Sequence, residues 1–243
     1  MEPGGYMKNL LIGAVLFCAV GSFCLWNVAA DAATAQGATF QWTSATKRIV
    51  MVEPDVQLME LDAGGILEPR ADWTKAAQSF IDSDIRSHLG KGGAELVKSD
   101  NASPHEVQLT KLHGVVGQAI LTHLYNSPLR LPNKGTALDW TLGPGTNEMR
   151  DHYGADYALF VFVRDSYSSA GRRAVQVLGV LASAALGAAV VPAGGVQIGF
   201  ASLVDLRTGN IVWFNRLISG SGDLRTEKPA QSTVDALIKD MPL

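Results

Sequence analysis

The stretch Tyr157-Ala158-Leu159-Phe160-Val161-Phe162-Val163 decides the fold of this chain. It holds no charged residue, and its aromatic and β-branched side chains favour extended backbone. A run that is apolar at successive positions, not at alternating ones, is typical of a strand with both faces covered. We therefore expect residues 157–163 to form a central strand that is buried on both faces.

Shorter extended segments are expected on either side of this strand along the chain. A buried strand at 47–52 ends at Pro54, because proline cannot donate a hydrogen bond within a sheet. The turn Asp205-Leu206-Arg207-Thr208-Gly209-Asn210 predicts an antiparallel hairpin. The other expected strands are residues 56–61 at an edge, 95–97, and the hairpin arms 196–204 and 211–215.

Two segments show the period of an amphipathic helix. From Trp73 to Leu89, apolar residues recur every three or four positions, and Asp72 is expected to cap the start. The second helix begins at the capping box Ser103-Pro104-His105-Glu106 and extends to Leu124. Further helices are expected at residues 147–153 and 230–239.

The order of these elements predicts an α/β fold. It consists of a mixed sheet flanked by helices, ending in a β-hairpin and a C-terminal helix. The chain has 243 residues, and residues 47–243 show neither an internal repeat nor a second linker. We therefore expect a single α/β domain over residues 47–243, with an apolar, helix-like insert at 172–192.

The N-terminal residues resemble an export signal. Lys8 precedes a near-continuous apolar run from Leu10 to Trp26, and small-x-small triplets follow near residues 30–35 as cleavage sites. We expect residues 1–32 to be a signal peptide and residues 33–46 a tether, with the domain in the periplasm. The run is long for a signal and short for a membrane span, so an uncleaved inner-membrane anchor is the alternative.

Cysteine use agrees with this division of the chain. Both cysteines, Cys18 and Cys24, lie inside the apolar run, and a bulky phenylalanine precedes each one. A lipoprotein signal would need small residues at that position. The remaining chain holds no cysteine, which excludes disulfides, thiol chemistry and cysteine-ligated metal.

Composition and motifs argue against several classes of function. The net charge is −3, with 20 basic and 23 acidic residues, so nucleic acid is not an expected partner. The five histidines show no close spacing of the kind that a helical metal site requires. No nucleophile elbow and no glycine-rich phosphate loop occurs. We expect no catalytic residue, no cofactor and no metal.

The insert at residues 172–192 is the least ordinary segment. It carries no charge from Ala174 to Val191, and Gly179, Ser183 and Gly187 recur four residues apart. Such a stripe of small residues lets helices approach closely. Three alternatives remain open: a helix buried across the sheet, an exposed helix for self-association or partner docking, and a segment that contacts or enters the membrane.

Two single residues are candidates for a site. Trp140 lies in a loop-rich region and forms either a binding surface or an anchor for that loop. Asp165 is expected at the end of the central strand, where loops often carry function, or as a hydrogen-bonding partner of the following turn.

The chain resembles envelope accessory proteins that share the fold of the TolB amino-terminal domain. This group includes the curli secretion channel family (CsgG), the activators of penicillin-binding proteins and the PelC-like exopolysaccharide lipoproteins. The resemblance rests on the strands beginning at Ile49 and at Gly154, and on the turn and strand from Val204 to Trp213. It covers roughly residues 47 to 240. Unlike most members, this chain lacks a lipoprotein signal, and its insert lacks the alternation of membrane strands.

The resemblance implies a non-enzymatic periplasmic role. We expect a protein that docks on or helps to assemble a cell-envelope complex, with itself or another envelope protein as partner. A small-molecule or glycan binder that uses the Trp140 loop is the alternative. An unrecognised hydrolase is a second alternative, because catalytic groups can be far apart in sequence.

Overall fold

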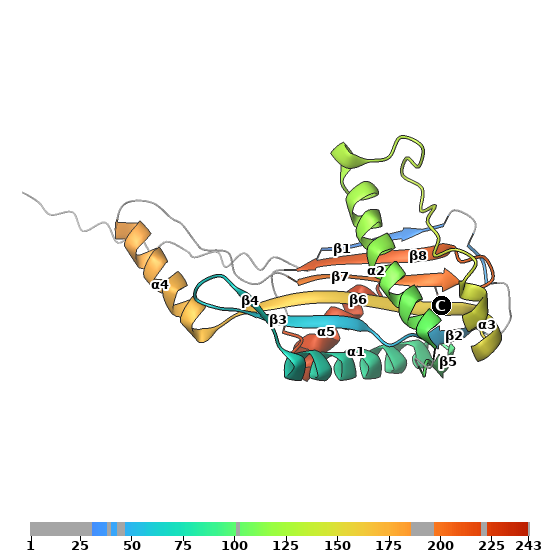
Figure 1. Ribbon diagram of the computed structural model, residues 1–243, viewed down its shortest axis with the longest axis horizontal. Helices are drawn as coiled ribbons and strands as arrows, with labels where there is room; N and C mark the ends of the chain where they lie inside the picture. The colour runs from blue at the N-terminus through green and yellow to red at the C-terminus, as the bar shows by residue number, and fades with distance from the viewer. Residues whose placement is uncertain are drawn as a thin grey trace, which may run out of the picture.

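The computed structural model describes residues 31–37, 40–42, 47–100, 103–185, 197–219 and 223–242. The described residues form one mixed sheet with helices around it (Figure 1). The strands are β1 (Asp31–Gln36), β2 (Arg48–Met51), β3 (Asp55–Leu61), β4 (Leu67–Pro69), β5 (Glu95–Lys98), β6 (Tyr157–Ser168), β7 (Gln197–Asp205) and β8 (Ile211–Ser219). The helices are α1 (Ala71–Lys91), α2 (Pro104–His123), α3 (Thr146–Tyr153), α4 (Ala170–Ala185) and α5 (Glu227–Leu237), with a short 3₁₀ helix at Ser127–Leu129.

Strand β6 lies at the centre of the sheet, as the sequence predicts. The strand order is β1-β8-β7-β6-β2-β5, and β3 continues along β6 beyond β2. Strands β2 and β3 run parallel to β6, β7 runs antiparallel to β6, and β8 runs antiparallel to β7. The prediction of an α/β fold that ends in a hairpin and a helix is therefore confirmed, with β7, β8 and α5 in those places.

Side chains of β6 alternate between two apolar clusters, one on each face of the sheet. Leu159 and Val161 point into the first cluster, while Phe160 and Phe162 point into the second. Helices α1 and α5 cover the first face, and α2 and α3 cover the second. Burial on both faces explains why the sequence of this strand is apolar at successive positions.

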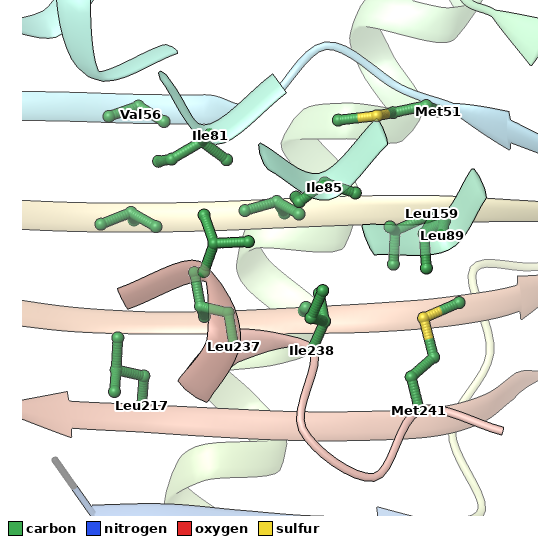
Figure 2. Close-up of a cluster of buried hydrophobic side chains, with 14 of the residues drawn as sticks. Met51, Val56, Ile81, Ile85, Leu89, Leu159, Leu217, Leu237, Ile238 and Met241 are labelled. Carbon is green, nitrogen blue, oxygen red and sulfur yellow. The ribbon is translucent and has the colours of Figure 1, made fainter. Parts of the chain in front are cut away.

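The first cluster forms where α1 and α5 meet the sheet (Figure 2). Ile81, Ile85 and Leu89 of α1 are fully buried against the sheet. Leu237 of α5 packs beside them and is also fully buried. This contact confirms the amphipathic period predicted for α1 and the helix expected at residues 230–239.

The second cluster is held by an unusually close approach of α2. A Cβ atom added to Gly117 would lie 2.0 Å from Cε2 of Phe200. The ring of Phe200 stacks on Phe162 at 4.7 Å and on Phe214 at 5.5 Å between centroids. Glycine at position 117 therefore lets α2 rest directly on a row of aromatic rings.

Strand β1 differs from the sequence prediction. Asp31 to Gln36 pair antiparallel with β8, so residues 33–36 belong to the sheet although we expected a tether over residues 33–46. Small side chains without alternation gave no signal for a strand, and the pairing depends on the backbone edge that β8 offers. The expected signal peptide lies outside the described residues except for Asp31 and Ala32.

Three further details correct the sequence analysis. Strand β3 is not an edge, because it lies between β6 and β4. Helix α1 begins at Ala71, and no side chain caps it, so Asp72 is not the cap. The predicted cap of α2 is confirmed, since Ser103 Oγ accepts a hydrogen bond from the Glu106 amide at 3.1 Å. Among the described helices, none has the length and apolar content needed to cross a membrane.

Candidate functional site

Helix α4 projects away from the sheet at the end of β6 (Figure 1). Ser169 accepts a hydrogen bond from the Arg172 amide at 3.0 Å, which fixes the first turn. Beyond it, Val175, Val177 and Leu178 are 46%, 59% and 65% exposed. A helix buried across the sheet does not fit these three side chains. An exposed helix for self-association or docking and a segment that contacts the membrane both agree with them.

The small-residue stripe is only partly within the described residues. Gly179 and Ser183 lie in α4, but their side chains fall outside the described part of the chain, as does Gly187 altogether. The role of this stripe in helix contacts remains a prediction.

Other exposed apolar side chains gather at the same end of the sheet. Ile66 and Leu67, in the β3–β4 hairpin, are 63% and 47% exposed. Ile198 and Ile218 face each other across β7 and β8 and are also exposed. Strand β3 ends beside the end of β6, which places the hairpin next to the start of α4. We call these four residues, together with Val175, Val177 and Leu178, the apolar end.

Asp165 lies inside β6, not at its end as expected, because the strand extends to Ser168. Its carboxylate is 3% exposed and accepts hydrogen bonds from Tyr167 and, at 2.7 Å, from Gln197. Burial raises the pKa of the Asp165 carboxyl, and the two hydrogen bonds oppose that rise. The geometry gives Asp165 a bridging position between β6 and β7, within the core.

Trp140 lines a hollow of about 350 Å³ beside the turn between β7 and β8. Its ring stacks near His123, and the Lys134 ammonium lies 5.0 Å from its centroid. Phe40 and Arg207 contribute to the same hollow. The Trp140 carbonyl accepts a hydrogen bond from the Ile211 amide at 2.8 Å, so its loop is attached to the hairpin. Both expectations for Trp140, a loop anchor and a binding surface, are compatible with this position.

A second small hollow, also of about 350 Å³, contains a buried carboxylate that the sequence analysis missed. Glu106 is 2% exposed, and its oxygens accept hydrogen bonds from Ser99 and from Tyr153. The Tyr153 hydroxyl also lies 2.7 Å from Asp100, so one proton serves two carboxylates. Burial, followed by these hydrogen bonds, raises the pKa of Tyr153. The capping-box pattern explains Glu106 as part of the start of α2, and it gives no indication of the contacts with Ser99 and Tyr153.

A serine and a histidine also lie together in the core. His113 Nε2 is 2.9 Å from Ser202 Oγ, but both residues are fully buried. Burial lowers the pKa of His113 to about 3. Within the described residues, Nδ1 of His113 has no hydrogen-bond partner, so no acid orients the imidazole. The pair therefore lacks the access and the third group of a hydrolytic triad.

A larger cleft, of about 1000 Å³, lies between α1 and the ends of β2 and β5. Lys75 and Lys98 line it together with Glu53 and Asp100, so charges of both signs line the cleft. Across the described parts of the chain, no three histidine, aspartate or glutamate side chains are grouped to hold a metal ion. The cleft therefore shows no single chemical preference.

Comparison with known proteins gives a likeness of fold. No protein-family model and no curated protein matches the sequence. The PelC dodecamer from Paraburkholderia phytofirmans is similar with a TM-score of 0.38 and 14% sequence identity, over 86% of this chain and 91% of that chain. A dodecamer of a PelC variant from the same organism gives 0.37 and 12%, over 86% and 97%. PelC is one of the envelope accessory proteins that the sequence resembles.

Proposed function

We propose that this protein is a non-enzymatic component of the bacterial periplasm that assembles with copies of itself through α4. The observation that carries the proposal is the exposure of Val175, Val177 and Leu178 on a helix that the sheet does not cover. Apolar patches of this kind on a soluble protein are typical of interaction sites.

The energetics favour a second copy of this chain as the partner that packs against α4. Removing a half-exposed valine or leucine from water contributes roughly 1 to 2 kcal/mol, and three such residues on each of two helices form a self-complementary surface. Gly179 and Ser183 follow in the same helix, and small residues allow two helix backbones to approach closely. The charged residues of α4, Arg172 and Arg173, lie at its first turn and leave the following turns uncharged.

The test is the mass of residues 31–243 in solution, measured by light scattering. This piece contains every strand, helix and core contact described above. We expect an oligomer that a double Val177→Asp, Leu178→Asp variant loses while its circular dichroism is unchanged. The matched control is Val115→Asp on α2, which alters a valine outside the apolar end that is at least as exposed as Val177. A monomeric wild type, or an equal loss in the control, contradicts the proposal.

A second candidate function is saccharide binding at Trp140. The hollow beside Trp140 combines an aromatic face with Arg207 and Asn210, which is the mixture that sugar rings and hydroxyls require. Tryptophan fluorescence titrated with envelope oligosaccharides tests it. Saturable quenching that a Trp140→Phe variant loses supports binding there, whereas quenching that persists in the variant contradicts it.

A further inference from the structure

We propose that the β3–β4 hairpin binds a phospholipid surface through its exposed tip, Ile66 and Leu67. This contact is separate from the self-association of α4, because it uses different side chains. It orients the domain, with the β3–β4 hairpin toward the membrane.

The hairpin presents its two apolar residues on a firm turn. The Ile66 amide donates to Asp62 Oδ1 at 2.7 Å, and the Asp62 amide donates to the Ile66 carbonyl at 2.9 Å. Gly65 adopts a φ of 89°, which closes the turn. The hydrogen bonds within the turn satisfy backbone groups that lipid would otherwise leave unpaired, so the cost of placing the tip in an interface is low.

The course of the N-terminal chain selects lipid as the occupant. Asp31 pairs with Ile218, so β1 starts at the apolar end. The uncharged run from Leu10 to Trp26 ends five residues earlier, and five extended residues span at most roughly 18 Å. Whenever that run occupies a bilayer, as a signal or as an anchor, Asp31 lies within that distance of the bilayer surface, and Asp31 starts β1 at the same end of the sheet as the hairpin.

Charges beside the hairpin suit lipid phosphates. The Arg172 guanidinium lies against the turn, since a Cβ added to Gly65 would be 3.8 Å from its Nη1. Among the described residues, Nε of Arg172 has no hydrogen-bond partner, and the neighbouring Arg173 is exposed. The turn carries Asp62, whose Oδ1 accepts a hydrogen bond from the Ile66 amide, and the exposed Glu68 follows Leu67 in β4. Arg172 therefore borders an apolar tip, and Arg173 follows it in the first turn of α4. A cation beside apolar side chains favours anionic headgroups.

The test uses the absence of cysteine from residues 31–243. A single Ile66→Cys variant is labelled with an environment-sensitive fluorophore and mixed with vesicles of phosphatidylethanolamine and phosphatidylglycerol. We expect the emission to move to shorter wavelength, and to do so less with vesicles of phosphatidylcholine alone. A Val115→Cys variant, labelled in the same way on α2, is the matched control and should show no shift.

The two proposals are separated by combining their variants. Adding Val177→Asp and Leu178→Asp to the labelled protein should abolish the oligomer and leave the shift at position 66 in place. No shift at position 66, or an equal shift at position 115, overturns the lipid contact whatever the oligomeric state. A shift at position 66 that disappears with the α4 variants also overturns it, because the hairpin would then report protein association.

Discussion

Helices α1 and α4 show opposite relations between composition and burial. Helix α1 contains six charged residues, yet its inner row of Ala77, Ile81, Ile85 and Leu89 is completely buried. Helix α4 has only two charged residues, but Val177 and Leu178 are mostly exposed. In these two helices, burial depends on whether the helix packs along the sheet or leads away from it, and not on its fraction of apolar residues.

The chain path explains this difference. Helix α1 turns back along the sheet after the β3–β4 hairpin, with Thr74 Oγ1 accepting a hydrogen bond from the Leu58 amide at 3.0 Å. Helix α4 starts where β6 ends and continues away from it (Figure 1). An apolar row at helical spacing, with charged residues on the other face, therefore marks the core helix, whereas the nearly uncharged α4 presents an apolar surface that a partner could cover.

The largest expected effect tests this comparison by truncating one large aliphatic side chain to alanine in each helix. Ile85→Ala in α1 removes fully buried atoms and should lower the free energy of unfolding by about 2–5 kcal/mol. Leu178→Ala in α4 should change it by less than about 0.5 kcal/mol, because that side chain is exposed in the single chain. Urea unfolding, at a protein concentration where the chain is monomeric, measures the free energy of unfolding of both variants. Similar losses in the two variants would mean that α4 is packed.

Helix α2 sharpens the comparison, because a glycine and not an apolar row determines its position. Gly117→Ala would force Cβ into the buried Phe200 ring and should cost about 3 kcal/mol. Gly114→Ala, whose Cβ would lie 3.3 Å from Phe162, is the matched change and should cost less. Thermal unfolding of the two variants shows which substitution destabilises the protein more. Equal melting temperatures would contradict the close approach at Gly117.

A smaller effect is expected from the buried imidazole on α2. The pKa of His113 is about 3 in the folded chain and about 6.5 when unfolded, so only the unfolded state takes up a proton between these values. Stability should therefore fall as the pH drops, by about 2 kcal/mol from pH 7 to pH 5 for this group. A His113→Leu, Ser202→Ala variant should lose that part of the pH dependence in urea unfolding. An unchanged slope would assign it to other groups.

Much of the architecture could be predicted from local patterns. The central strand, the hairpin of β7 and β8 and the helices α1, α2 and α3 all follow from residues near one another in the chain. Strand β1 could not be predicted, because its Ala-rich sequence forms a strand only where β8 offers a free edge. The position of Asp165 was misplaced for a related reason. The β3 partner extends β6 through Ser168, beyond the apolar run.

The candidate sites were less predictable than the fold. The apolar end brings together residues from the β3–β4 hairpin, α4, β7 and β8, which no short motif connects. Glu106 matched a capping motif, so the pattern offered a complete explanation before its contact with Tyr153 was visible. Trp140 was identified by its loop context, which indicated a place on the surface but not its neighbours.

The pairing of β1 with β8 also bears on the timing of folding. The first strand of the described chain has its partner at the far end of the sequence, with Asp31 opposite Ile218. Contacts between such distant segments form late, because the intervening chain loses much entropy when its ends meet. The sheet therefore stays open at one edge until nearly the whole polypeptide has been delivered. If the predicted signal peptide sends the chain through a translocation channel as an extended thread, this late closure of the sheet keeps the chain threadable for longer.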